Sequence, residues 1–348
     1  MSPTVNHKKL EDLCARLLNK AGASENHAAI TAKCLVDADL CGVDTHGVSR
    51  MEVYMKRLEA GGVNCGGSPR VIYEYPGAAL IDGDGCLGQV TSIMAMEMAI
   101  EKAKTAGCYT VFVRNSSHYG MAAYYTRMAA EAGMAASTST SAPSALAPWG
   151  SHKAFFGPDP ISYAFPSPDG VPIVLDMAPS VVPRGRLMLA INNGETIPEG
   201  WAVDKEGNPT TDPKKAWEGT LLPIGGHKGA GLTMCLDILS GILPGAAFGP
   251  HIGSLFDDTD RTQNIGHIFT VYDPSMFAGK ERFMSDIAAL KAEVRALPRN
   301  PGVNEILLPG EIEARRKAER LEKGIPLSDK TYKMLVGLCE AHQMEADI

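Results

Sequence analysis

The sequence predicts an α/β protein in which a mixed β-sheet is flanked by helices and preceded by a helical segment. Residues 5–62 show helical spacing of apolar side chains, whereas short β-rich runs alternate with helices from Val71 onward. These runs lack the regular strand–helix–strand repeat of a purely parallel sheet. With 348 residues, 45% of them apolar, the chain is long enough for about two domains, each with its own core.

The N-terminal segment predicts three helices. Leucines at helical spacing and a terminating Gly22 define the first, and Ser24 is placed to cap the second. A third is expected to start near Asp44 or Thr45 and to end at Gly61.

The remaining chain is divided by glycine and proline into short elements. Strands are expected at 71–73, 78–81, 109–113, 161–165, 173–175 and 267–272. Helices are expected at 89–105, 120–132, 281–297 and 311–323, with a buried helix at 229–243 and a turn at 203–209.

Composition excludes several classes of function. A formal charge of −7 argues against a nucleic-acid-binding surface, and the most apolar stretch, 230–248, is interrupted by Asp237 and Pro244, so no membrane partner is expected. The N-terminus lacks the apolar run of about 7–15 residues found in a signal peptide. None of the eight cysteines forms a C-x-x-C pair, and no metal site is expected. These features predict a cytoplasmic protein with reduced cysteines.

The segment Gly83–Gly88 matches the G-x-G-x-x-G pattern between an expected strand and an expected helix. A dinucleotide site also needs an acidic residue at the end of the second strand, where this chain has Arg114 and Asn115. The motif is therefore expected to be a structural turn rather than a phosphate site.

Two segments offer acid–base chemistry. If residues from Thr45 onward are helical, then His46, Arg50 and Tyr54 share one face, where arginine can bind a carboxylate and histidine can move a proton. His118 lies in the turn between an expected strand and helix, where functional side chains are often presented. The alternatives are a solvated helix face capped by Thr45 and a structural loop histidine.

A further pair of segments offers an anion site. Residues 176–180 (D-M-A-P-S) follow a strand, and residues 225–231 are glycine-rich, contain Lys228 and enter an apolar helix. Amide groups at a helix start together with one lysine can bind a phosphate. Alternatively, these glycines allow a helix to pack closely on the sheet.

Together these motifs resemble those of the malate/L-lactate dehydrogenase family. They are D-T-H-G-V-S-R-M, N-S-S-H-Y-G, A-P-W-G, V-L-D-M-A-P-S, I-P-E-G-W-A-V-D, L-L-P-I-G-G-H-K-G and L-P-G-E, and they occur in the family's order between residue 41 and about 325. The resemblance implies a non-Rossmann, largely antiparallel sheet, a nicotinamide cofactor (NAD or NADP, with NAD preferred) and a homodimer. It also implies a helical domain of residues 1–72 plus about 300–348 that contributes substrate-binding residues, and a cofactor-binding domain of residues 73–299.

The resemblance further implies hydride transfer between nicotinamide and C2 of a small 2-hydroxy or 2-oxo acid, similar to malate, lactate or sulfolactate. The alternative is reduction of a cyclic 2-imino acid. The catalytic residues implied are His118, as acid or base, and His46, as a group that polarises the substrate. The substrate-binding residues implied are Arg50, Tyr54 and Thr45. The cofactor-binding residues implied are Asp176, Met177, Ala178, Ser180, His227, Lys228, Gly229, Gly310 and Glu311.

The chain also departs from the family pattern. Asp159 stands where many members have asparagine, which predicts altered loop contacts, and Ala142-Pro143 replaces the Ser-Asp pair of the ureidoglycolate enzymes, which disfavours that substrate. Arg184 and Arg186 are candidates for binding the 2′-phosphate of NADP, or are ordinary surface charges.

Overall fold

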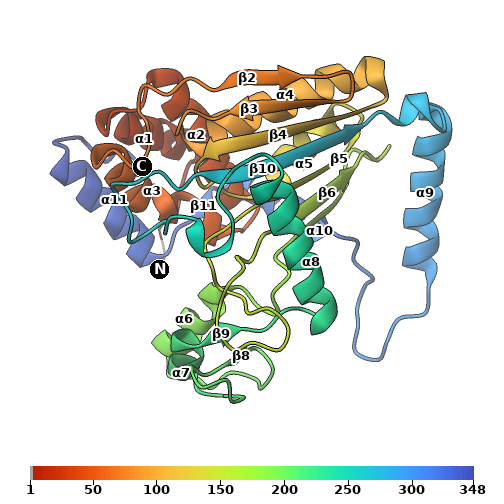
Figure 1. The fold of residues 1–348 in the computed structure, drawn as a ribbon. Helices are drawn as coiled ribbons and strands as arrows, with labels where there is room; N and C mark the ends of the chain where they lie inside the picture. The colour runs from red at the N-terminus through yellow and green to blue at the C-terminus, as the bar shows by residue number, and fades with distance from the viewer. Residues whose placement is uncertain (1–2) are drawn as a thin grey trace.

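The computed structural model describes residues 3–348, and its centre is a seven-stranded sheet (Figure 1). In spatial order the strands are β2 (Arg70–Glu74), β3 (Ala78–Asp82), β4 (Cys108–Ser116), β10 (Ile265–Tyr272), β5 (Ala135–Thr140), β6 (Ile161–Phe165) and β7 (Ile173–Met177). Only β3 and β4 pair in parallel, and every other neighbouring pair is antiparallel. The expected mixed, largely antiparallel sheet is therefore confirmed.

Helices from both ends of the chain form a layer beside the sheet. They are α1 (His7–Lys20), α2 (Glu25–Leu40), α3 (Met51–Glu59) and α11 (Asp329–Ala341), and β1 (Thr4–Val5) pairs with β11 (Ile325–Pro326). Apolar side chains of all these elements share one core, and Figure 1 shows the two termini on the same side of the molecule. The Ser24 hydroxyl accepts from the His27 amide, so the predicted cap of α2 is confirmed.

One face of the sheet is covered by α4 (Gly88–Ala106) and α5 (Ala122–Glu131). Alanines of both helices pack against β4, β5 and β10, and because alanine is small, the helices lie close to the strands. Helix α10 (Glu311–Lys323) packs on α2 and returns the chain to the N-terminal layer.

On the opposite face, the π-helical η3 (Ile238–Ile242) packs on β10 and continues α8 (His227–Asp237). A Cβ on Gly266 of β10 would lie 1.7 Å from the Ser240 carbonyl oxygen, so only glycine allows this approach. The helix expected at 229–243 is present but only partly buried, because one stripe of its apolar side chains stays exposed.

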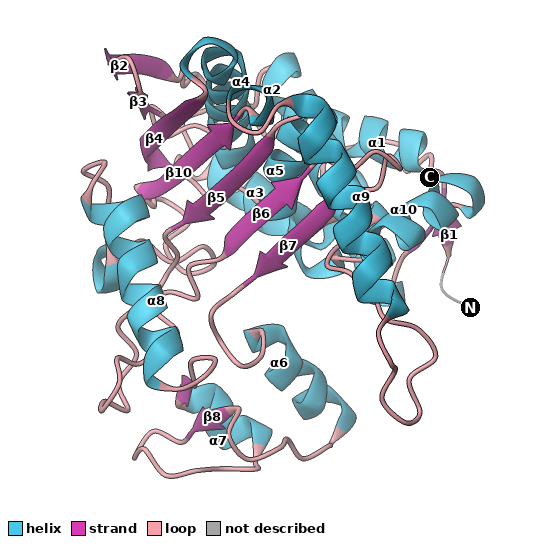
Figure 2. Cartoon of the chain, turned by 90° about the vertical axis from the view of Figure 1, so that its right-hand side faces the viewer, coloured by secondary structure: helices cyan, strands magenta, loops and turns pink. Residues whose placement is uncertain are grey.

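The elements after β7 form a small lobe with its own apolar core. They are α6 (Arg184–Asn193), β8 (Ala202–Val203), α7 (Pro213–Glu218) and β9 (Thr220–Leu221), and Figure 2 shows them beyond the end of β7. The short 3₁₀ turns are η1 (Asp44–His46), η2 (Val48–Arg50), η4 (Gly249–His251) and η5 (Pro274–Met276).

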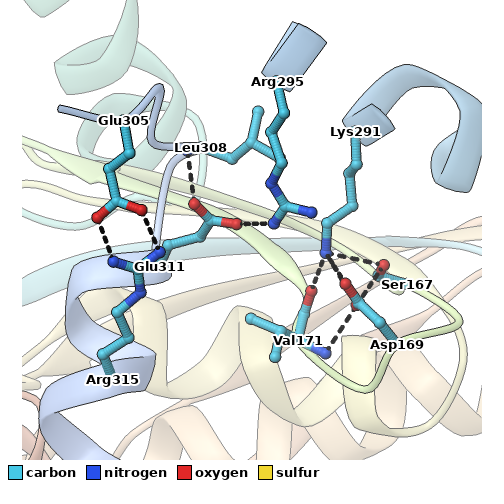
Figure 3. A network of polar contacts seen from close by, with 9 residues as sticks. All are labelled: Ser167, Asp169, Val171, Lys291, Arg295, Glu305, Leu308, Glu311 and Arg315. Atoms are coloured by element: carbon cyan, nitrogen blue, oxygen red, sulfur yellow. Dashed lines mark hydrogen bonds and ion pairs between the residues drawn. The ribbon is translucent and has the colours of Figure 1, made fainter. Parts of the chain in front are cut away.

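Helix α9 (Lys280–Ala296) lies at the side of the sheet and is held by polar contacts (Figure 3). The buried Lys291 ammonium donates to Ser167 Oγ (3.1 Å), Asp169 Oδ1 (2.8 Å) and the Val171 carbonyl (2.9 Å). All eight cysteines are free thiols. Within residues 3–348, no helix has both the length and the apolar character needed to span a bilayer.

Candidate active site

Four residues predicted from the sequence lie together where the N-terminal helical layer joins the sheet: His46, Arg50, Tyr54 and His118. The expected continuous helix from Thr45 is wrong. Gly47 has an extended backbone (φ −91°, ψ −151°) and separates η1 from η2 before α3 begins. A Cβ on Gly47 would lie 2.0 Å from Asp39 Oδ1, and Asp39 Oδ2 accepts from the Val48 amide (2.8 Å). The buried Asp39 carboxyl therefore shapes the turn that carries His46.

Tyr54 and His118 are joined directly. The Tyr54 hydroxyl lies 2.7 Å from His118 Nδ1, and Gln89 Nε2 donates to the same hydroxyl at 2.9 Å. Tyr54 belongs to α3, Gln89 to the first turn of α4 and His118 to the loop after β4, so the N-terminal helical layer meets the sheet layer at this point. Tyr54 and Gln89 are buried, whereas His118 is half-buried, and its Nε2 has no hydrogen-bond partner within residues 3–348.

His46 lies beside His118 with its ring nearly parallel. The ring centroids are 5.8 Å apart and the planes are inclined by 20°. Thr45 Oγ1 lies 3.0 Å from His46 Nδ1, which leaves His46 Nε2 without a partner in the described part of the chain. Each histidine is thus held by a hydroxyl at Nδ1 and has Nε2 available for a bound molecule.

Arg50 completes the cluster. Its Nε donates to the Thr45 carbonyl (2.6 Å), and its guanidinium carbon lies 5.2 Å from the ring centre of Phe256. Within residues 3–348 its two terminal nitrogens have no hydrogen-bond partner. These nitrogens are free to bind a carboxylate in the bidentate manner that arginine favours.

The surroundings of both histidines favour the neutral imidazole. Burial, followed by the nearby Arg50 charge, lowers the pKa of His46 to about 4. The pKa of His118 is lowered well below its ordinary value, first by burial and then by His46 and Arg50. A neutral imidazole can accept a proton, and the surrounding positive charge favours a negatively charged ligand.

The Gly83–Gly88 segment is the turn between β3 and α4. A Cβ on Gly88 would lie 2.2 Å from the Ser117 carbonyl oxygen, so glycine lets α4 begin directly against the His118 loop. On the other side of that loop, the His118 amide donates to Gln263 Oε1 (3.2 Å). The motif therefore contributes to the site by supporting the His118 loop.

The predicted cofactor segments gather around the end of β7. Asp176 and Met177 end this strand and Ala178 follows it, while Ser180 forms a β-bridge with Pro223, just before the glycine-rich turn. The Asp176 carboxylate accepts from the Ala123 amide (2.7 Å) at the start of α5, next to the His118 loop. Thus the two sets of predicted residues occupy connected parts of the structure.

The start of α8 has the form of an anion site. Gly225 and Gly226 have positive φ angles (61° and 64°), and nothing lies within 4 Å of a Cβ placed on Gly225. His227 and Lys228 are exposed in the first turn, and Gly229 is required because its Cβ would lie 2.0 Å from the Ile224 carbonyl oxygen. This open helix start with one lysine fits the diphosphate of a dinucleotide.

Gly310 and Glu311 lie on the other side of β7. The Val174 amide donates to the Pro309 carbonyl (3.0 Å), which brings Gly310 against the strand. The Glu311 carboxylate is buried, pairs with Arg295 and accepts from the Leu308 amide (3.0 Å), as Figure 3 shows. In this structure Glu311 ties the start of α10 to α9.

Sequence reasoning missed three residues of the site: Gln89, Gln263 and Phe256. None has a motif of its own, since their contacts join segments that are far apart in the sequence. Asp159, which was expected to alter loop contacts, is fully buried and accepts from the Ala142 amide (2.9 Å).

Comparison with known proteins gives the family. Residues 5–336 match the family model described as malate/L-lactate dehydrogenase. A malate dehydrogenase of Pyrococcus horikoshii is 41% identical over 94% of this chain and 92% of its own. The sulfolactate dehydrogenase structure of Methanocaldococcus jannaschii superimposes with a TM-score of 0.93 at 37% identity, covering 99% of this chain and 98% of that one.

Relatives differ in substrate and cofactor. An NAD(+) ureidoglycolate dehydrogenase of Escherichia coli O157:H7 is 33% identical, covering 95% of both chains. An NADP(+) (2R)-3-sulfolactate dehydrogenase of Chromohalobacter salexigens is 35% identical over 93% of this chain and 94% of its own. A Δ1-piperideine-2-carboxylate reductase structure from Pseudomonas syringae has a TM-score of 0.87 at 27% identity, covering 97% of this chain and 100% of that one. The chain belongs to the malate/L-lactate dehydrogenase family of nicotinamide-dependent oxidoreductases.

Proposed function

We propose that this protein transfers a hydride between nicotinamide and C2 of a small 2-hydroxy or 2-oxo acid, similar to malate, lactate or sulfolactate. The observation that carries the proposal is the cluster of His118, His46 and Arg50, in which two neutral imidazoles adjoin a guanidinium with free terminal nitrogens. A small acid presents the matching groups, namely a carboxylate and a neighbouring oxygen that gains or loses a proton.

Each residue then has a defined task. Arg50 binds the substrate carboxylate, and Thr45 and Tyr54 orient His46 and His118 through their Nδ1 atoms. His118 Nε2 takes the hydroxyl proton as the alcohol is oxidised and returns it in the reverse direction, so that charge does not accumulate on the oxygen. His46 donates a hydrogen bond that polarises the same oxygen.

The residues around β7 and α8 fit the dinucleotide. The amides at the start of α8, together with Lys228 and the exposed His227, would hold its diphosphate. Asp176, Met177, Ala178, Ser180, Gly229, Gly310 and Glu311 would shape the remainder of this site. When bound, nicotinamide supplies or accepts the hydride, while the protein orients the substrate and excludes water.

We propose NAD rather than NADP as the preferred cofactor. The Arg184 guanidinium lies 4.5 Å from the ring centre of Trp217, and its Nη2 donates to the Trp217 carbonyl (3.1 Å). This engagement disfavours Arg184 as a ligand for a 2′-phosphate, which leaves Arg186 as the candidate from that segment.

Reduction of a cyclic 2-imino acid is the second candidate. Such a substrate needs the same carboxylate anchor and hydride donor, and it is supported by the similarity to the Δ1-piperideine-2-carboxylate reductase structure. Its ring nitrogen would receive the proton from His118.

A substrate panel tests these proposals. Oxaloacetate, pyruvate, sulfopyruvate and Δ1-piperideine-2-carboxylate are each offered with NADH and NADPH, and nicotinamide absorbance is followed. The primary proposal predicts that a 2-oxo acid with NADH gives the highest kcat/KM. Preference for the imine would establish the second candidate, and turnover of none of the four would contradict both.

We propose that the protein is a homodimer. Six apolar side chains of α8, η3 and the next residue are 38–58% exposed: Leu232, Met234, Ile238, Leu239, Ile242 and Leu243. Figure 2 shows this helix at one side of the sheet and α9 at the other. Between these two helices, the strands are in view with no described helix in front of them. Light scattering should give twice the chain mass, and Ile242→Glu should halve it, whereas Tyr75→Glu in the exposed turn after β2 should not. A monomeric wild type would contradict this proposal.

We also propose that residues 1–72 with about 300–348 act as the substrate-binding domain and residues 73–299 as the cofactor-binding domain. The core shared by α1, α3 and α11 supports the first. Eight free thiols support action in the reducing cytoplasm.

A further inference from the structure

The buried amide of Gln89 reaches His118 only through Tyr54. Its Nε2 donates to the Tyr54 hydroxyl (2.9 Å), which lies 2.7 Å from His118 Nδ1. The other end of the amide, Oε1, is buried and has no hydrogen-bond partner among the described residues. We propose that Gln89 is a positioning residue that determines, through the Tyr54 hydroxyl, which ring nitrogen of His118 carries the proton. The inference rests on the proposed role of His118.

The Tyr54 hydroxyl has one proton, so the direction of its hydrogen bond with Gln89 is linked to the direction of its hydrogen bond with His118. When the Gln89 amide N–H donates to Tyr54, the Tyr54 proton is free to point at His118 Nδ1. Nδ1 then accepts, and a neutral His118 carries its proton on Nε2. In this arrangement Nε2 is a donor suited to the carbonyl oxygen of a 2-oxo acid, and it cannot act as a base.

The opposite arrangement needs an acceptor beyond Tyr54. If the Gln89 amide makes a half-turn, Oε1 accepts the Tyr54 proton, and Tyr54 in turn accepts from Nδ1–H of His118. His118 Nε2 then has a free lone pair. During oxidation the hydroxyl proton of the 2-hydroxy acid moves to Nε2, and the C2 hydride moves with its two electrons to the oxidised nicotinamide. The products are the 2-oxo acid, reduced nicotinamide and a protonated His118.

Glutamine suits this position because one side chain offers both a donor and an acceptor. Burial raises the pKa of Tyr54, so its hydroxyl stays protonated. The direction of the hydrogen bond between residue 89 and this hydroxyl then decides whether the hydroxyl donates to His118 Nδ1 or accepts from it. Gly120 leaves space beside the amide, since a Cβ there would lie 3.4 Å from Gln89 Nε2.

The other groups around His118 all act on it in one direction. His46 from η1, Arg50 from η2, Arg57 from α3 and His267 from β10 lower the pKa of His118. Within residues 3–348, none of these four groups forms a hydrogen bond to a His118 ring nitrogen, and each would disfavour protonation of either nitrogen. The hydrogen bonds of Tyr54 and Gln89 therefore determine which ring nitrogen of His118 carries the proton.

Two nearly isosteric substitutions test the inference in protein free of substrate and nucleotide. The ¹⁵N shifts of the His118 ring report its tautomer, and His118→Ala identifies its signals. Gln89→Glu offers an acceptor at neutral pH and should move the proton to Nδ1 and raise the His118 pKa by about one unit or more. Gln89→Met offers neither group, so it should keep the proton on Nε2 and lower that pKa by about one unit.

Kinetics give a second readout. Because Gln89→Met removes the arrangement in which His118 is a base, kcat for oxidation should fall about ten- to hundredfold with little change in substrate KM. Gln263→Met is the matched control, since this glutamine bonds the His118 main-chain amide rather than the ring. It should leave the ring tautomer unchanged.

The Tyr54→Phe background separates a relay from a direct effect of charge. In that background the tautomer of His118 should no longer depend on residue 89. Unchanged ring shifts in Gln89→Glu, or the same change with and without the Tyr54 hydroxyl, would overturn the inference. Normal turnover by His118→Ala would instead contradict the proposed function and leave the tautomer result standing, so the two failures are distinguishable.

Discussion

Single residues shape the candidate site mainly by allowing close approach of the backbone. Gly47 separates two 3₁₀ turns, and the Asp39 carboxyl lies where its Cβ would be. Gly88 likewise allows α4 to begin close to the His118 loop, because a side chain at this position would collide with the Ser117 carbonyl. The family motifs therefore contain glycine beside the chemically active residues for reasons of space.

Substitution of Gly47 should reveal this role. In Gly47→Ala the new methyl group would lie 2.0 Å from Asp39 Oδ1, so the turn carrying His46 must move. We expect a loss of stability of about 1–3 kcal/mol and a reduced kcat/KM, measured by denaturant unfolding and steady-state kinetics. Gly77→Ala is the control, because the φ of Gly77 is also not positive and a Cβ there would meet nothing within 4 Å. Equal activity losses in both variants would contradict a specific clash.

The buried His267 should make stability depend on pH. Its ring is fully buried and bonded at both nitrogens, to Thr140 (2.7 Å) and Ser116 (2.9 Å), and burial lowers its pKa to about 3. Below about pH 6.5, His267 binds a proton in the unfolded chain but stays neutral in the folded protein. The contribution of His267 to the free energy of unfolding therefore falls as the pH falls.

Comparison of the wild type with His267→Gln isolates the contribution of His267 to the pH dependence of stability. The difference in unfolding free energy between wild type and variant should narrow by about 1.4 kcal/mol per pH unit between pH 6 and 4, as measured by urea unfolding. His152→Gln changes an exposed histidine and is the control. A difference that stays constant with pH would contradict a neutral, buried His267.

At the scale of elements, one buried arginine joins α3 to the loop that carries Phe256. Arg57 is 1% exposed and donates to four carbonyls, those of Gly62, Ser254, Asp258 and Arg261. Phe256 of this loop lies against Arg50, so Arg57 indirectly holds one wall of the candidate substrate site.

Arg57→Met should free that loop. The four carbonyls lose a buried donor, and we expect a loss of stability of about 3–5 kcal/mol and a higher substrate KM. Hydrogen exchange should show faster amide exchange in residues 254–261 than in wild type. Unchanged exchange there, with only global destabilisation, would show that Arg57 does not hold the loop.

The sequence predicted those elements whose pattern is local. Helix α4 and its stop at Gly107, and the strands β2, β3, β6 and β7, have clear periodicity or glycine boundaries. Strand β5 was missed because Ala135–Thr140 consists of small and polar residues whose partner, β10, lies more than a hundred residues away. The break at Gly47 was missed because its cause, Asp39, belongs to another element.

At the scale of the whole molecule, the site lies where two layers meet. Helix α3 and the preceding turns supply His46, Arg50 and Tyr54, while the loop after β4 and the start of α4 supply His118 and Gln89. The motifs allowed the candidate catalytic residues to be named from the sequence, but the two glutamines that contact Tyr54 and the His118 main chain could be found only from the fold.

The central claim is that His118 moves the proton during hydride transfer. The most direct measurement is kcat of His118→Ala with the best 2-oxo acid of the panel, together with the Kd of the nicotinamide nucleotide. Loss of the acid–base group should lower kcat about 10²–10⁴-fold while Kd stays near that of the wild type. An unchanged kcat in this variant would contradict the account.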